Sequence, residues 1–97
     1  MSKYIALFKL TEQGIQDIKS APQRVEQAVS GIESLGGKLV DFYMVMGEYD
    51  YVAIAEFPND EAAMTFLMAL GSLGNVRSTT LKAFDRGQLT ELVSKLP

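Results

Sequence analysis

Four stretches of the chain have the hydrophobic pattern of β-strands. Tyr4–Leu10 is an almost continuous apolar run, and Lys38–Met46 and Tyr51–Phe57 are rich in Val, Ile, Tyr and Phe, which suit a pleated sheet. Val76–Phe84 alternates apolar and polar positions loosely, which indicates a partly exposed strand. Gly47 interrupts the two central runs and supplies the permissive backbone that a chain reversal needs, so we predict a β-hairpin there.

The segment between the first two strands is predicted to be helical in two pieces. A short first piece follows Thr11, which is a suitable N-cap residue. The helix restarts at Ser20-Ala21-Pro22, because proline is tolerated only in the first turn of a helix. The longer piece then presents one apolar face, formed by residues three or four positions apart and ending before Gly36-Gly37: Val25, Ala28, Val29, Ile32 and Leu35.

Two later helices differ in how their apolar residues are distributed. Pro58-Asn59-Asp60 ends the third strand and caps a helix from Glu61 to about Leu73 that is apolar nearly all round. Gly71-Ser72-Leu73-Gly74-Asn75 follows this helix, so we interpret it as a C-cap and not as a phosphate-binding loop, since the C-terminus of a helix favours cations. Asp85 caps a final helix with a narrow apolar stripe: Leu89, Leu92, Val93 and Leu96.

The order of these elements predicts an α+β fold. The sequence strand, helix, strand, strand, helix, strand is the ferredoxin-like β-α-β-β-α-β pattern, a four-stranded antiparallel sheet with helices on one face, here followed by a C-terminal helix. Both central strands are apolar on two sides. In the second strand we place Leu39, Tyr43 and Val45 on one face, and on the other Val40, Phe42, Met44 and Met46. The face without helices therefore needs a cover, and we expect a homo-oligomer, in the first instance a dimer.

Composition narrows the classes of function. Residues 1–97 are interpreted as a single domain, and the net charge of −3 without a cluster of Lys and Arg argues against nucleic acid as a partner. The absence of cysteine and histidine excludes disulfides, thiolate nucleophiles, histidine-dependent triads and the usual zinc sites, and we predict no metal site. No apolar run is long enough for a signal-peptide core or a membrane span. We expect a cytoplasmic protein that does not associate with membranes.

The hairpin tip holds the strongest candidate for a site. Glu48-Tyr49-Asp50 places two carboxylates and a phenol beside Gly47, which turn chemistry explains in large part, because Asp bonds nearby backbone and Gly accepts positive φ. The alternative is contact with a ligand, or an acid and base pair. The aromatic residues around the hairpin, Tyr43 among them, are candidates for an apolar pocket, a core or an oligomer interface. Arg77 is a solvated residue or a partner for Asp41 or Asp50.

Three segments together resemble the GYD domain family. They are Leu10-Thr11-Glu12-Gln13-Gly14-Ile15, Gly47-Glu48-Tyr49-Asp50 at the hairpin, and Leu70-Gly71-Ser72-Leu73-Gly74-Asn75-Val76-Arg77, and the resemblance spans nearly the whole chain. It implies a small bacterial or archaeal protein with a dimeric α+β barrel type of fold. The hairpin is also similar to that of the effector-binding domain of the leucine-responsive regulator family, where a Gly-x-Tyr-Asp turn lies near subunit contacts. This chain has no DNA-binding segment, so the similarity does not imply transcriptional control by the chain itself.

We therefore expect a GYD-type homo-oligomeric module that binds a small molecule at or near a subunit interface. The candidate ligand-binding residues are Gly47, Tyr49, Asp50, Arg77 and Tyr43. One alternative is a cofactor-independent enzyme, monooxygenase- or isomerase-like, that works in an apolar barrel cavity with a desolvated Asp41 or Asp50 as base. The other alternative is a purely structural assembly protein. The sequence names no catalytic residue and no cofactor.

Overall fold

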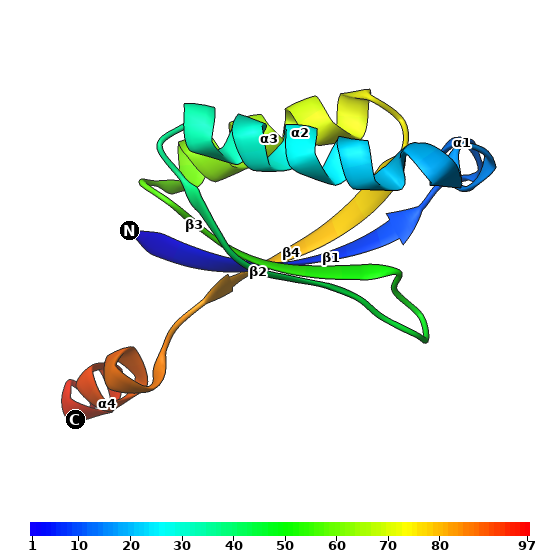
Figure 1. The fold of residues 1–97 in the computed structure, drawn as a ribbon. Helices are drawn as coiled ribbons and strands as arrows, with labels where there is room; N and C mark the ends of the chain where they lie inside the picture. Colours follow the sequence, from blue (N-terminus) through cyan, green and yellow to red (C-terminus); the bar gives the residue numbers. More distant parts are fainter.

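The computed structural model describes all 97 residues and has the predicted ferredoxin-like fold. Four antiparallel strands form one sheet in the order β2-β3-β1-β4, and helices α2 and α3 lie together on one face of it (Figure 1). Helix α4 projects away from the sheet beyond the end of β4 (Figure 1). No helix is long and apolar enough to cross a membrane. The elements are β1 (Ser2–Leu10), α1 (Glu12–Gln16), the 3₁₀ turn η1 (Ile18–Ser20), α2 (Ala21–Ser34), β2 (Lys38–Met44), β3 (Tyr51–Phe57), α3 (Asp60–Ser72), β4 (Val76–Ala83) and α4 (Arg86–Ser94).

The helices begin where the sequence predicts, and three of them have a side chain that satisfies a free backbone N–H at their start. Thr11, Asn59 and Asp85 are the N-caps of α1, α3 and α4, and each accepts a hydrogen bond from the backbone N–H three residues later. Pro22 lies in the first turn of α2, as expected for a residue without an N–H. These local contacts fix where the helices begin.

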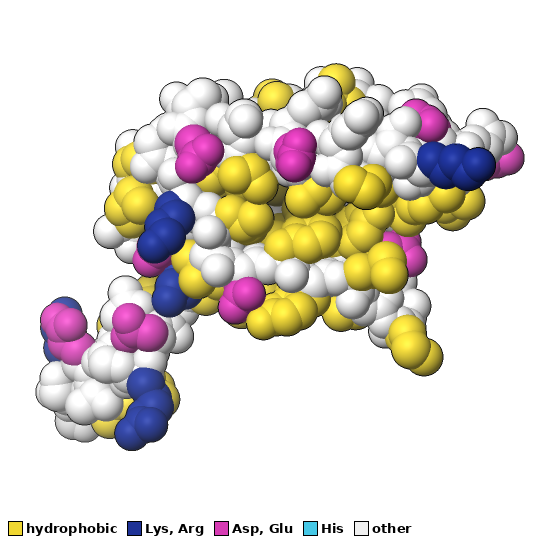
Figure 2. Space-filling model, in the orientation of Figure 1, with side chains coloured by type: hydrophobic (Ala, Val, Ile, Leu, Met, Phe, Trp, Pro, Cys, Tyr) yellow, Lys and Arg dark blue, Asp and Glu magenta, His cyan; other side chains and the backbone are white.

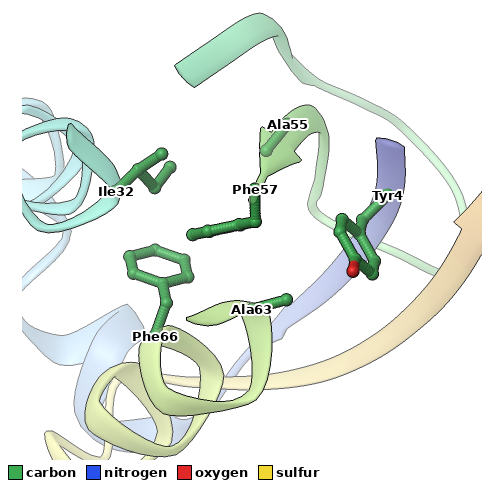
Figure 3. Close-up of a cluster of buried hydrophobic side chains, with 6 residues drawn as sticks. All are labelled: Tyr4, Ile32, Ala55, Phe57, Ala63 and Phe66. Atoms are coloured by element: carbon green, nitrogen blue, oxygen red, sulfur yellow. The ribbon is translucent and has the colours of Figure 1, made fainter. Parts of the chain in front are cut away.

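The main core lies between the helices and the sheet. Residues of β1 and β3 alternate, so that every second side chain is buried on the inner face, the one that α2 and α3 cover. Phe57 is placed between Ile32 of α2 and Phe66 of α3, with the two phenylalanine ring centroids 5.7 Å apart (Figure 3). Tyr4 meets Phe57 edge to face at 5.9 Å. This cluster joins both helices to the N-terminal half of β1.

Strand β2 departs from the predicted alternation. A bulge at Val40 breaks the register, so that Leu39 lies opposite Ala55 and Phe42 lies opposite Ala53, both on the inner face. Tyr43 is therefore on the outer face, and the prediction that it shares a face with Leu39 is wrong. The strand also ends at Met44 and not at Met46. One extra residue in a strand moves every side chain that follows it to the other face of the sheet, and a strict period of two cannot anticipate this change.

A cavity of about 570 Å³, which we call the inner cavity, separates part of the sheet from the helices. Ala6 and Ala53 face it from directly opposite positions on β1 and β3, and Ala55 lies beside them. Side chains this small leave space that neither α2 nor α3 fills. Figure 2 shows the resulting band of hydrophobic side chains between the helical layer and the sheet.

Candidate functional site

The hairpin turn is anchored to the end of β1 by Asp50. Gly47 has φ = +110°, as the turn requires, and no other atom would lie within 4 Å of a Cβ there. The Asp50 backbone N–H donates to Phe8 O at 2.8 Å, and its carbonyl accepts from the Val45 N–H at 2.9 Å. Its carboxylate accepts the Leu10 N–H at 2.8 Å. Asp50 thus fixes the hairpin to β1. This is the structural role in the turn that the sequence analysis set against contact with a ligand.

The other two motif segments meet at the same place. The Thr11 N–H donates to Asn75 O at 3.0 Å, and the Thr11 hydroxyl donates to Gly74 O at 2.5 Å. Gln13 reaches across the same junction, because its Nε2 donates to Leu73 O at 2.9 Å and to Asn75 Oδ1 at 3.0 Å. Together with the Asp50 contacts, these bonds make the three motifs one network around the C-terminal end of β1.

A small polar pocket, the hairpin pocket, lies beside this network. Lys9, Tyr49, Arg77, Ser78 and Thr79 line it, and its volume is about 120 Å³. Lys9 Nζ is 5.4 Å from the centroid of the Tyr49 ring, a cation–π distance. Lys9 and Arg77 are directly opposite each other on β1 and β4. Two cations, a phenol and two hydroxyls in so small a space suit a small anion.

The structure brings only some of the predicted site residues together. Tyr49 and Arg77 share the hairpin pocket, but Tyr43 lies on β2, at the other edge of the sheet from β4, and is 54% exposed. Arg77 forms no ion pair with Asp41 or Asp50. Gly47 and Asp50 shape the turn that carries Tyr49.

Lys9 was missed by the sequence reasoning. The one feature of the sequence that could have drawn attention to Lys9 is that it interrupts the apolar run of the first strand. Glu48 Oε1 is 3.5 Å from Lys9 Nζ, but both side chains are exposed, so this ion pair contributes little and leaves the ammonium available.

The proposed catalytic carboxylates do not face the inner cavity. Asp41 is exposed on the outer face of β2, and Asp50 is turned to the backbone of β1. No Asp or Glu lines the cavity. Glu48 and Asp50 also point to different partners, Lys9 and Leu10, and do not form an acid and base pair. The site geometry favours binding over catalysis by these groups.

A second polar contact lies at the opposite end of β1. The Tyr4 hydroxyl donates to the Asp60 carboxylate, and Lys82 Nζ is 3.0 Å from the same side chain. Burial, and then this hydrogen bond, raise the pKa of Tyr4 above 10.0. The bond from Tyr4, and then the one from Lys82, lower the pKa of Asp60 below 3.8. This trio ties β1, α3 and β4 together and is not part of the hairpin pocket.

Comparison with known proteins agrees with this architecture. A protein from Thermus thermophilus named "Glutamine synthetase and cystathionine beta-lyase binding protein" is 28% identical over 97 aligned positions, and the alignment covers 99% of each chain. A protein of known crystal structure from Thermus thermophilus is 25% identical, with a TM-score of 0.57 over 88% of this chain and 95% of that one. A feast or famine regulatory protein from M. tuberculosis, in complex with L-methionine, has the same fold. Its TM-score is 0.66 at 18% identity, over 88% of this chain and 51% of that chain.

The family assignment rests on more than the fold. The model of the GYD domain matches residues 4–93, from the first core residue of β1 to the last turn of α4. That range includes the three motif segments, which the structure gathers at one end of the sheet. The chain belongs to the GYD domain family.

Proposed function

We propose that this protein is a homo-oligomeric binding module that takes a small anionic molecule in the hairpin pocket, at the edge of a subunit interface. The observation that carries the proposal is the position of this pocket. Lys9 and Arg77, which line it, continue the rows of side chains on the outer face of the sheet, the face without helices. A ligand bound there would lie at the border of any partner that covers this face.

The outer face has the composition of an interface. Two successive rows across β3, β1 and β4 are almost wholly apolar: Ile54, Ile5 and Leu81, then Val52, Leu7 and Thr79. Polar rows flank them, with Glu56 and Lys3 at one end and Lys9 and Arg77 at the other. An apolar centre with a polar rim is typical of protein interfaces.

A second copy of the chain is the partner that this face suits. The face carries both acidic and basic side chains at its rim, so an antiparallel copy can place unlike charges together around an apolar centre. This would complete the dimeric α+β barrel that the family resemblance implies.

The charge of the hairpin pocket selects the class of ligand. Like charges directly opposite on neighbouring strands destabilise a sheet, so an anion between Lys9 and Arg77 would relieve their repulsion. Charge-assisted hydrogen bonds from an ammonium and a guanidinium are strong ones for a carboxylate. The L-methionine held by the structurally similar regulatory protein supports a carboxylate as the group that is bound, with any ammonium group of the ligand turned away from Lys9 and Arg77.

Light scattering at micromolar concentration tests the oligomer. We expect a dimer or a larger closed assembly for the wild type and a monomer for Leu81→Lys, which places a charge in the apolar centre of the outer face. Ser30→Lys, on an exposed position of α2, is the matched control and should leave the assembly intact. A monomeric wild type would contradict the proposal.

Calorimetric titration with L-methionine and other amino acids tests the ligand. Arg77→Gln and Lys9→Gln should each weaken binding about tenfold or more, since each removes one charge-assisted contact. Lys82→Gln is the control, because Lys82 pairs with Asp60 at the far end of β1. Asp50→Asn should bind normally, as the amide oxygen can still accept the Leu10 N–H. An assembled protein that binds no amino acid would favour the purely structural alternative.

The relative from Thermus thermophilus supports a second candidate function, binding to a metabolic enzyme. Its name specifies glutamine synthetase and cystathionine beta-lyase, and the two chains match from end to end, α4 included. In this chain α4 exposes an apolar stripe that contains Leu89 and Leu92. Biolayer interferometry against both purified enzymes tests this function. Leu89→Glu should abolish binding if α4 is the contact, and Thr90→Glu on the same helix is the control.

A further inference from the structure

Helix α4 has an apolar stripe that its own chain leaves uncovered. No residue of the helix is buried, and no other element packs closely against it. Figure 2 shows α4 as a lobe that stands apart from the rest of the molecule. The side chains of the stripe are between 49% and 69% exposed: Leu89, Leu92, Val93 and Leu96.

The helix is too short to be stable without a surface to pack on. It has nine residues, and isolated helices shorter than about 12–15 residues are marginal in water. The capping box of Asp85 and Gln88 satisfies backbone groups at the first turn and contributes nothing to the later turns. The stripe therefore needs a cover from outside this chain.

The position of α4 places it beside the outer face. The helix follows β4, whose last residue, Ala83, pairs with Lys3 of β1. The polar row of Lys3 and Glu56 borders the outer face at this end of the sheet. Figure 1 shows α4 on the other side of the sheet from α2 and α3. A second copy that covers the outer face therefore lies next to α4.

The opposite end of the sheet also has uncovered apolar side chains. We call it the hairpin end, and it includes Ile15 of α1, Leu73 after α3 and Met46 of the hairpin, which are 57%, 61% and 99% exposed. Lys3 and Lys9 of β1 are about 20 Å apart at roughly 3.3 Å per residue, so α4 cannot reach the hairpin end of its own chain. The chain thus has two uncovered apolar surfaces, one at each end.

The outer face alone is small for a stable interface. Only alternate residues of its strands point outward, and these strands are seven to nine residues long. A standard interface uses about 20–30 residues on each side. The stripe of α4 and the hairpin end would supply the contact area that the outer face lacks.

We propose that α4 is an arm exchanged between two copies of the chain, with its stripe packed on the hairpin end of the other copy, beside the hairpin pocket there. This rests on the proposed dimer through the outer face. An antiparallel copy brings the hairpin end of one chain to the α4 end of the other, and two-fold symmetry makes the contact twice. An α4 held in this way is not free to bind an enzyme, so the arm excludes the enzyme contact through Leu89.

Light scattering over a dilution series tests the arm through the dissociation constant of the dimer. We expect Leu92→Lys to raise this constant about tenfold or more, the effect of losing a central apolar contact in an interface. Ser94→Lys introduces the same charge two positions later, on the other side of the helix, and should leave the constant unchanged. Neither change touches the core, so both variants should keep the wild-type fold in circular dichroism.

Crosslinking shows where the arm lies, because the chain has no cysteine of its own. Glu48→Cys combined with Leu92→Cys should give a covalent dimer with a bismaleimide too short to join the two positions within one chain. Ser30→Cys combined with Leu92→Cys is the matched control and should stay monomeric on a denaturing gel, since Ser30 is on α2.

The outcomes separate the arm from the dimer itself. A monomeric wild type overturns both the dimer and the arm. A dimeric wild type overturns the arm alone if Leu92→Lys leaves the dissociation constant unchanged, or if the Glu48 and Leu92 cysteine pair forms no covalent dimer. The first of these results would leave α4 free for a different protein. Open-ended growth of the wild type with concentration would also overturn the arm, because a two-fold exchange closes at two copies.

Discussion

Replacing Gly14 by alanine tests the idea that the three motif segments form one structural junction. A Cβ at this position would lie 2.2 Å from Asn75 O and 3.1 Å from Leu10 Cδ2. Asn75 O also accepts the Thr11 N–H at 3.0 Å, so the carbonyl cannot move away without losing that bond. The added methyl group therefore forces the start of α1 away from the loop before β4.

The size of the effect follows from three terms. Forcing a methyl group into a filled site costs about 1–3 kcal/mol, and losing one backbone hydrogen bond costs about 1 kcal/mol. Alanine recovers up to about 1 kcal/mol relative to glycine in a helix, and Gly14 lies in α1. The net loss of stability is about 1–3 kcal/mol, which for a domain of this size lowers the melting temperature by about 5–20 °C.

Urea unfolding and thermal melting at one fixed protein concentration would measure this loss. Gly71→Ala is the control, because Gly71 lies in α3 and a Cβ there would meet no atom within 4 Å. The control should be as stable as the wild type, or more stable by up to about 1 kcal/mol. If Gly14→Ala melts at or above the wild-type temperature, the junction is not as rigid as the structure indicates.

Asp50→Ala should lower the free energy of unfolding in urea by about 1–3 kcal/mol, because it leaves a backbone N–H of β1 without its acceptor. Asp50→Asn should lower it by less than about 1 kcal/mol, and equal losses for the two variants would contradict the anchoring role. Gly47→Val should lower the free energy of unfolding by about 1–3 kcal/mol through strain at φ = +110°, and Glu48→Ala should lower it by less than about 0.5 kcal/mol. Similar shifts of the melting temperature for the two variants would argue against the turn geometry. Because the folded-state pKa of Tyr4 is raised, its contribution to stability is present below pH 10.0 and is lost as the pH rises through the folded value. Because the folded-state pKa of Asp60 is lowered, the contribution of Asp60 to stability is present above pH 3.8 and is lost as the pH falls through the folded-state pKa. Tyr4→Phe should weaken both dependences in melting curves across pH, and an unchanged profile would exclude this hydrogen bond as their source.

The junction at the end of β1 explains why the motif residues belong together. Thr11 donates to the backbone of Gly74 and Asn75, and Asp50 bonds the backbone of Phe8 and Leu10, so three distant segments are joined at the end of β1. Their shared effect is to hold Tyr49 beside Lys9. The three motif segments thus have a structural role, and the junction that they form holds the hairpin pocket in place.

The sequence by itself determined the elements and their order, because those signals are local. A capping side chain bonds a backbone N–H only three residues away, as Thr11, Asn59 and Asp85 do. The alternation of Tyr51–Phe57 shows which side chains share a face of the strand, but both faces are apolar and only the structure shows which of them enters the core. Gly47 likewise marks a turn by its own backbone freedom.

Only the tertiary structure decided which residues meet. Leu10 and Asp50 are 40 positions apart and Thr11 and Gly74 are 63, so their contacts depend on the topology of the whole sheet. The bulge at Val40 arises from pairing with β3, and no local periodicity marks it. The lining of the inner cavity likewise depends on the topology, because alanines on separate strands come to lie directly opposite each other only when β1 and β3 pair.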